Sequence, residues 1–313
     1  MQIIKLKWIA FLLGAAAAAL MAHGPLVALR ELSSRDEMYS HIPLIPVAAL
    51  YFFWVSRKKV ECVSGWSPAI GALVGVSGLI LYWGATRLGD ALQPQDRIAI
   101  QIFFMVILVQ AVFITLFGLK AAREAAFPLL FLFLVVPFPS IVQDWVVSLL
   151  QRGSAEATHF IFSLTWVPFF REGFVFQVPG ISVEVAPQCG GIRSGIALAI
   201  TCLVAGKLFL ARAWSRAALI VACVPITIFK NGLRIVGLTL GAIYIDPRIL
   251  ESQLHRSGGI PFFALAMAMT APVLWALYKL ENRRKKPSEP PGQEPENPGS
   301  KAASPGDGNA ENA

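Results

Sequence analysis

The apolar residues of this chain are concentrated in long runs, and the polar residues fall in the segments between them. Such runs are typical of helices that cross a bilayer, because a hydrocarbon core of about 30 Å needs roughly 20 apolar residues of helix. Two of the runs are short enough to form buried helices instead, and counting them as spans gives eight. The predicted spans cover residues 8–29, 42–55, 69–85, 98–119, 125–137, 192–210, 217–243 and 260–280.

The first run follows Lys5 and Lys7 and is rich in alanine, a pattern that also occurs in cleavable signal peptides. The run is longer than the apolar region of such a peptide, however. It is interrupted only late, at His23-Gly24-Pro25. We therefore expect an uncleaved first span.

The longest connection, residues 138–187, contains two further predicted elements. In residues 141–162 apolar side chains recur at helical spacing with polar ones between them, which predicts an amphipathic helix on the membrane surface. Residues 174–185 have the pattern of two short strands on either side of a Pro-Gly pair, which predicts a hairpin. The apolar residues at helical spacing are Ile141, Trp145 and Leu149.

The composition supports the membrane class. The chain is 56% hydrophobic and 15% charged, against about 45–50% and about 25% in soluble domains. We attribute the net charge of +8 to membrane topology. Because no stretch alternates basic with aromatic residues, we exclude a nucleic-acid partner. The cysteines and histidines lack the spacing of a zinc site, so we expect neither a structural metal nor a cofactor.

Basic residues cluster in alternate connections between the predicted spans, while the other connections hold acidic residues and balancing arginines. By the positive-inside rule, the basic side faces the cytoplasm. Removing either short span would put a basic cluster on the wrong side, so the pattern supports counting both. The basic clusters are Lys5 and Lys7, residues 57–59, Lys120 and Arg123, then Lys207, Arg212 and Arg216, and residues 283–286.

These patterns predict an all-α polytopic protein of the plasma (inner) membrane. It has about eight transmembrane helices, an extracytoplasmic amphipathic helix and a short β-hairpin. Residues 1–282 form the membrane domain. Residues 283–313 are first basic and then rich in Pro, Glu and Gly, a composition that cannot bury a core. We expect this tail to be disordered and cytoplasmic.

Cys189 lies where a polar, strand-like segment meets the apolar run that begins at Ile192. At a helix N-terminus the dipole and the free N–H groups favour a thiolate. Gly190 and Gly191 place no side chain between the backbone and a substrate. Most cysteines beside apolar runs are inert core residues. In the predicted topology, however, Cys189 faces the oxidising compartment with no cysteine to pair with, which favours a reactive thiol.

Arg234 lies within the seventh predicted span, about 25 Å along a helix that starts at Ala217, near the outer edge of the membrane core. An arginine at this depth is costly unless it is paired, hydrated or extended to the lipid headgroups. Asn231 lies three residues earlier and shares the helix face of Arg234, which predicts a polar cavity. Lys230 points elsewhere, and the sequence gives it no partner.

His255 precedes the last predicted span, on the same side of the membrane as Cys189 and Arg234. A neutral imidazole can accept the proton of a thiol and return it to a leaving amine. Arginine cannot act as a base, so its natural roles are to stabilise a thiolate or an oxyanion, or to bind a carboxylate. His159, on the predicted amphipathic helix, is the competing candidate for the base.

Three short boxes of this chain resemble, in the same order, those of the exosortase/archaeosortase family of polytopic membrane proteins. Each box is weak alone, but all three at the outer ends of successive spans are fairly specific. The resemblance implies a cysteine protease or transpeptidase, a hydrolase acting on peptide bonds, and it extends over most of the chain. The boxes are Cys189-Gly190-Gly191-Ile192-Arg193-Ser194, Asn231-Gly232-Leu233-Arg234 and His255-Arg256-Ser257-Gly258.

The resemblance also implies the partners. Family members act on secreted proteins whose C-terminus carries a short motif (Pro-Glu-Pro in the bacterial exosortases, hence PEP-CTERM), one membrane span and a basic cluster. They cut near the motif and pass the new carboxyl end to an envelope acceptor. This chain has Gly190 where the family usually has Ser or Asn, and Gln188 where Ala is common. These departures leave the catalytic set intact and the substrate motif open.

By this resemblance, Cys189 is the expected nucleophile, Arg234 stabilises the oxyanion, and His255 serves as general base and then acid. Two other classes of function stay open. A transporter or channel would line an anion path with Arg234 and Lys230, and a non-catalytic envelope scaffold would use the polar cluster only to hold helices together. The residues expected to orient the catalytic set or the substrate are Asn231, Arg193, Gly190 and Gly191.

Overall fold

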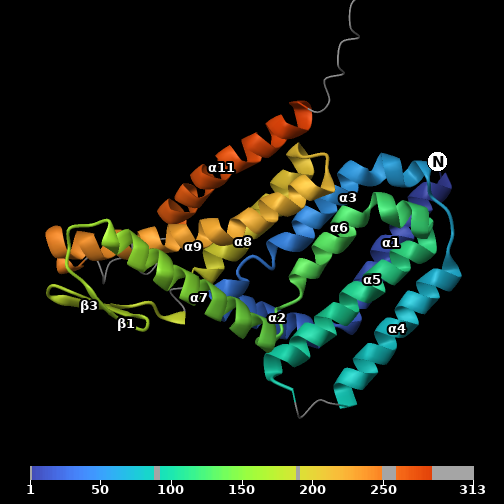
Figure 1. Cartoon of the computed structure of the whole chain (residues 1–313). Helices are drawn as coiled ribbons and strands as arrows, with labels where there is room; N and C mark the ends of the chain where they lie inside the picture. The colour runs from blue at the N-terminus through green and yellow to red at the C-terminus, as the bar shows by residue number, and fades with distance from the viewer. Residues whose placement is uncertain (1, 88–91, 188–190, 249–258, 284–313) are drawn as a thin grey trace, which may run out of the picture.

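The computed structural model describes residues 2–87, 92–187, 191–248 and 259–283 of the chain (Figure 1). Nearly all of the predicted tail, residues 284–313, lies outside the described residues. The elements are α1 Gln2–Met21, α2 His23–Arg35, η1 Glu37–Tyr39, α3 Leu44–Cys62, α4 Pro68–Arg87, α5 Pro94–Glu124, α6 Ala126–Phe131, η3 Leu132–Val135, α7 Ser140–Ser163, β1 Phe170–Glu172, β2 Val175–Val178, β3 Ile181–Glu184, α8 Ile192–Phe209, α9 Ala213–Tyr244 and α11 Gly259–Arg283.

The chain is an all-α polytopic membrane protein, as predicted. In the described part of the chain six helices are long and apolar enough to cross a membrane, or seven if one bent pair counts as a single span. This is one or two fewer than the eight predicted. The six are α1, α4, α5, α8, α9 and α11.

The two short predicted spans account for the difference. The run at 42–55 becomes α3, whose last turns carry Arg57, Lys58, Lys59 and Glu61. The run at 125–137 becomes α6 and η3, and the chain then bends by 89° into α7. The helix ends at Val136, which is extended, with φ −73° and ψ 123°, because a residue that precedes a proline is disfavoured in helical geometry.

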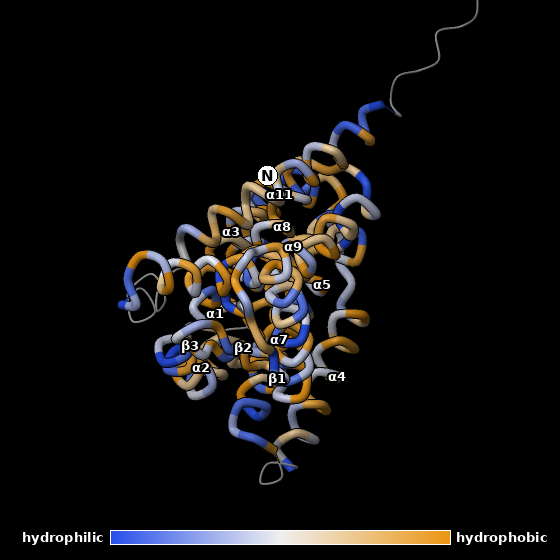
Figure 2. The backbone as a smooth tube through the Cα atoms, turned by 60° about the vertical axis from the view of Figure 1, so that its left-hand side comes forward, coloured by the Kyte–Doolittle hydropathy of each residue, from blue (hydrophilic) through white to orange (hydrophobic). Residues whose placement is uncertain are grey.

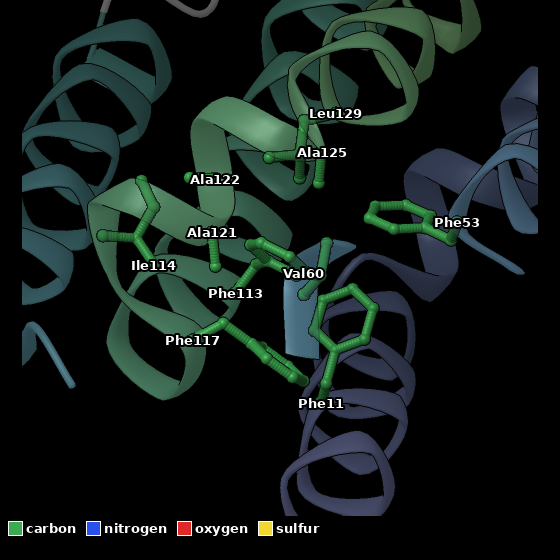
Figure 3. Close-up of a cluster of buried hydrophobic side chains, with 10 residues drawn as sticks. All are labelled: Phe11, Phe53, Val60, Phe113, Ile114, Phe117, Ala121, Ala122, Ala125 and Leu129. Atoms are coloured by element: carbon green, nitrogen blue, oxygen red, sulfur yellow. The ribbon is translucent and has the colours of Figure 1, made fainter. Parts of the chain in front are cut away.

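Aromatic residues from three helices lie at the centre of one buried cluster (Figure 3). The ring of Phe113 lies 5.3 Å from that of Phe11, 5.6 Å from that of Phe53 and 4.8 Å from that of Phe117. Edge-on and offset ring pairs stabilise beyond the area that they bury. The cluster therefore fixes α1 and α3 against the C-terminal half of α5.

The outer faces of the helices remain apolar. Figure 2 shows hydrophobic stretches along the helices and hydrophilic ones towards helix ends and in the sheet. On α4 the side chains of Leu73, Ile80 and Leu81 are 70%, 64% and 59% exposed. Exposed apolar faces of this kind match the lipid environment of a membrane-spanning helix, so the lipid bilayer is their natural partner.

The basic connections gather at one end of the molecule. The Lys7 ammonium donates to the Gly65 carbonyl at 2.7 Å, which joins the start of α1 to the turn between α3 and α4. The Glu281 carboxylate accepts from the amides of Ala211 and Arg212, which joins the end of α11 to the turn between α8 and α9. In Figure 1 these parts lie on the upper side, and the sheet and the start of α5 lie on the lower side. The membrane side that each end faces stays a prediction.

The predicted hairpin is confirmed as strands β2 and β3, joined at Pro179-Gly180, where Gly180 has φ +82°. The sequence interpretation missed β1, which pairs antiparallel with β2 and makes a three-stranded sheet in the order β1-β2-β3. Phe176 and Val178 on β2 are buried, and Gln177 between them is exposed. This alternation places one face of the sheet against α7 and α9.

The amphipathic helix predicted at 141–162 forms as α7 and packs along α9 through glycines. A Cβ atom on Gly232 would lie 2.8 Å from Ala157 Cβ and 3.0 Å from the Ala157 carbonyl carbon. A Cβ on Gly153 would lie 2.6 Å from Ile228 Cδ1. The two helices therefore approach as closely as their backbones allow, as small residues permit in membrane proteins.

This contact predicts opposite effects for two glycines of α9. Gly232→Ala should destabilise the protein by about 1–3 kcal/mol, because the new methyl group meets backbone atoms of α7 that cannot give way cheaply. Gly237→Ala should be neutral or stabilise by up to about 1 kcal/mol, since nothing lies within 4 Å and alanine favours helix. Unfolding midpoints of the purified variants in detergent would compare the two, and equal midpoints would contradict the close approach.

Candidate functional site

Two of the three predicted catalytic residues, Cys189 and His255, lie outside the described residues, as does Gly190. Arg234, Asn231, Arg193 and Gly191 are described. The site is therefore built from the elements that flank the cysteine and from the polar row on α9.

The segment that leads to Cys189 is fixed by two hydrogen bonds. The Val185 amide donates to the Phe174 carbonyl at 2.9 Å, which closes the base of the hairpin. The Val185 carbonyl accepts from Gln151 Nε2 at 2.8 Å, and Val185 is fully buried. Phe174 and helix α7 thus hold the chain at Val185, four residues before the cysteine.

On the other side of the cysteine, Gly191 caps α8 in a conformation that requires glycine. Its φ is +78° and its ψ is 17°, in the left-handed region. A Cβ at this position would also lie 3.2 Å from Asn231 Cγ and 3.3 Å from Asn231 Oδ1. The cysteine box and the asparagine box, which are some 40 residues apart in the sequence, are therefore in direct contact.

Asn231 is the centre of this contact. It is fully buried on α9, and its Nδ2 donates to Ser154 Oγ on α7 at 3.0 Å. One helical turn further along α8, a Cβ on Gly195 would lie 3.1 Å from Thr227 Cγ2 of α9. Asn231 thus links α7, α8 and α9 at the point where α8 begins.

Lys230, for which the sequence gave no partner, has one in the structure. Its ammonium donates to Ser194 Oγ at 2.6 Å, and Ser194 Oγ in turn donates to the Gly191 carbonyl at 3.0 Å. Lys230 is only 1% exposed. This relay ties the middle of α9 to the first turn of α8 and to Gly191, which is two residues after the cysteine.

Arg234 lies on α9 one helical turn beyond Asn231 and is half-buried. Its guanidinium carbon lies 5.9 Å from the ring centre of Phe262, in the first turn of α11. Helix α11 follows the segment that contains His255. The arginine therefore lies beside the point where that segment rejoins the described chain. Arg193, in the first turn of α8, is exposed.

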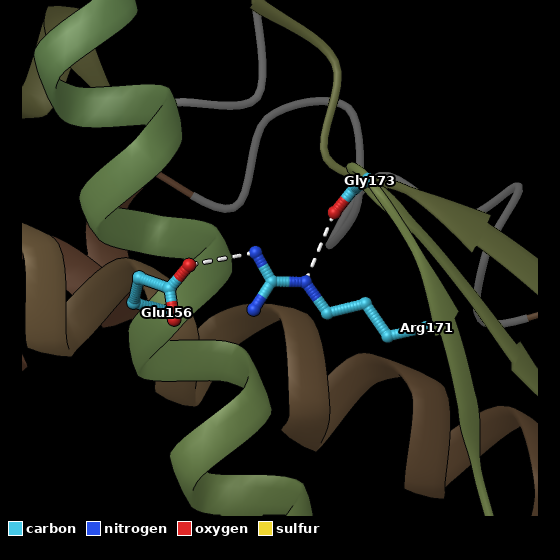
Figure 4. A network of polar contacts seen from close by, with 3 residues as sticks. All are labelled: Glu156, Arg171 and Gly173. Atoms are coloured by element: carbon cyan, nitrogen blue, oxygen red, sulfur yellow. Dashed lines mark hydrogen bonds and ion pairs between the residues drawn. The ribbon is translucent and has the colours of Figure 1, made fainter.

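His159, the competing candidate for the base, lies beside the sheet. It is exposed on α7, with its ring edge-on to Phe169 at 5.3 Å. Near it, Arg171 of β1 donates to the Glu156 carboxylate at 2.8 Å and to the Gly173 carbonyl at 2.9 Å (Figure 4). This ion pair ties the sheet to α7.

A sequence model of the transmembrane exosortase family matches residues 32–271. The chain belongs to this family. The match contains all three boxes and most of the described helices of this exosortase. Exosortases are generally cysteine transpeptidases of the sorting kind. No curated protein and no solved structure matches the chain.

Proposed function

We propose that this exosortase cleaves the C-terminal sorting signals of secreted proteins at the outer face of the plasma membrane and transfers the new carboxyl end to an envelope acceptor. The observation that supports it best is the contact of Gly191 with Asn231, which brings the cysteine box and the asparagine box of the family together. The half-buried Arg234 lies one turn away on the same face of α9.

In the proposed reaction the Cys189 thiolate attacks the peptide carbonyl carbon, and a carbon–sulfur bond forms. The oxyanion is stabilised by the Arg234 guanidinium and by backbone N–H groups of Gly190 or Gly191. The carbon–nitrogen bond then breaks, and His255 delivers to the leaving amine the proton that it took from the thiol. An acceptor nucleophile attacks the thioester, which releases Cys189 as the thiol. Water in the same step would give hydrolysis.

The first turn of α8 suits this chemistry. The amides at a helix N-terminus and the aligned peptide dipoles stabilise a thiolate close by. Asn231 holds the start of α8 against α9, and we assign it the role of orienting the cysteine. We give Arg193, exposed on the same turn, a role in orienting the substrate.

The proposed side of action rests on the distribution of charge. Helix α8 runs for 18 residues, roughly 27 Å, from the cysteine box to a turn that contains Arg212 and precedes Arg216. Since basic connections face the cytoplasm, the cysteine end of α8 is assigned to the outer face. The alternative of an anion path gains no support, because Lys230 is buried and donates to Ser194.

Co-expression with a reporter tests the proposal. The reporter is a secreted protein that ends in a Pro-Glu-Pro motif, a membrane span and a basic cluster, in a host that leaves it uncut. With the exosortase present, we expect a shorter reporter, released from its own span. A reporter with the basic cluster but without the motif serves as the matched control. Equal sizes with and without the exosortase, over a panel of related motifs, would overturn the proposal.

A further inference from the structure

A groove of about 550 Å³ lies between α1 and α3. In Figure 1 these helices lie on the opposite side of the molecule from the sheet that precedes the cysteine box. Two contacts form its floor. Trp8 Nε1 donates to the Glu61 carboxylate at 3.1 Å, and the rings of Phe11 and Phe53 lie 5.7 Å apart. Residue numbers rise along α1 as they fall along α3, so the two helices run antiparallel. The lining residues are Ile4, Lys5, Trp8, Phe11, Leu12, Leu50, Phe53, Trp54, Arg57, Lys58 and Glu61.

The groove has a charged end and an apolar end. Lys5 on α1 and Arg57 and Lys58 on α3 line the first, and Leu12 and Leu50 line the second. At 1.5 Å per residue, about 10 Å separates Lys5 from Leu12 along α1, and about 12 Å separates Lys58 from Leu50 along α3. Both helices therefore change from basic to apolar in the same direction.

The charge of the groove is positive on balance. The three cations at its rim are exposed, and the Glu61 carboxylate accepts the hydrogen bond of the Trp8 indole. The Arg57 guanidinium lies 4.8 Å from the ring centre of Trp54, which is 59% exposed. Exposed tryptophan beside basic residues is typical of the level of the lipid headgroups. The basic end of the groove thus lies at that level, and the apolar end extends into the hydrocarbon.

We propose that this groove binds an anionic phospholipid. The phosphate would lie among the three cations, and an acyl chain would follow the apolar floor towards Leu12 and Leu50. Basic pockets between transmembrane helices recognise headgroups of this kind. A zwitterionic lipid carries the same phosphate together with its own cation, so it would bring no net negative charge to the three cations. The basic cluster of a sorting signal would be repelled by them, so the groove does not suit the membrane span of a substrate.

Native mass spectrometry of the full chain in a neutral detergent tests the proposal. We expect phosphatidylglycerol to bind at least about tenfold more tightly than phosphatidylcholine with the same acyl chains. The triple variant Lys5→Gln, Arg57→Gln, Lys58→Gln should lose this preference. The matched control Lys120→Gln, Arg123→Gln, Lys279→Gln removes as many exposed cations and should keep it.

A second variant tests the apolar end without changing charge. Leu50 is 56% exposed, so Leu50→Trp should fold and fill the groove. It should weaken phosphatidylglycerol binding severalfold, and soluble glycerol phosphate should not compete with the lipid. Equal binding of the two lipids, or a preference that survives the first triple variant, would overturn the proposal. Loss of the preference for phosphatidylglycerol in the control variant would also overturn the proposal, because Lys120 and Arg123 line a different cavity, of about 570 Å³.

Discussion

Replacing Cys189 with alanine is expected to reduce cleavage of the sorting-signal reporter by at least about 1,000-fold, because the reaction loses the atom that forms the covalent intermediate. Uncut reporter should accumulate in the membrane at its full size, and immunoblotting of membrane fractions would measure the ratio of cut to uncut reporter. The variant should reach normal abundance, since alanine is smaller than cysteine and two glycines, Gly190 and Gly191, follow this position in the sequence.

Cys62 provides the matched control for this substitution. It is exposed at the end of α3, next to the basic cluster at residues 57–59. Cys62→Ala should cleave the reporter as the unmodified exosortase does. Normal processing by Cys189→Ala at equal abundance would refute the cysteine mechanism while leaving family membership untouched. Loss in both variants would indicate that the assay reports folding.

The runs of apolar residues predicted most of the helices, because a membrane-spanning helix must satisfy its backbone internally and cover itself with apolar side chains. They gave the wrong prediction where a run is short, because a short apolar run can form either a membrane span or a helix that ends before it crosses the bilayer. Residues 125–137 are apolar enough to cross part of a bilayer, but the prolines at 137 and 139 end the helix and turn the chain into α7. The strand β1 was missed because three residues are too few to show an alternating pattern.

The contacts of the candidate site could be predicted only in part. Helical spacing placed Asn231 and Arg234 on one face of α9. It could not show that this face meets the start of α8, since the periodicity of one helix does not reveal its partner. For the same reason the sequence gave no partner for Lys230, although its partner Ser194 lies within the cysteine box. The sequence feature that could have indicated the contact between α8 and α9 is Gly191, because a glycine leaves room for a side chain of another helix.

Breaking the Lys230–Ser194 relay from its two ends is expected to give unequal losses of stability. Ser194→Ala removes the acceptor from an ammonium that is 1% exposed, and should cost about 1.5–3 kcal/mol. Lys230→Met removes the charge with its desolvation cost and keeps the volume, and should cost less than about 1 kcal/mol. The double variant should be more stable than Ser194→Ala alone. Denaturant titration of the purified proteins in mixed micelles would measure all three.

Thr201→Ala is the matched control, because the Thr201 hydroxyl on the same helix donates only to the Ala197 carbonyl in the described structure. It should cost no more than about 1 kcal/mol, the net contribution of one local hydrogen bond. If Ser194→Ala behaved like Thr201→Ala, the buried ammonium would have another acceptor and the relay would not hold the start of α8.

If the losses of stability follow the expected order, Lys230→Met should still slow reporter cleavage about tenfold. Ser194 would still donate to the Gly191 carbonyl but would no longer be linked to α9, so the first turn of α8 would be positioned less firmly.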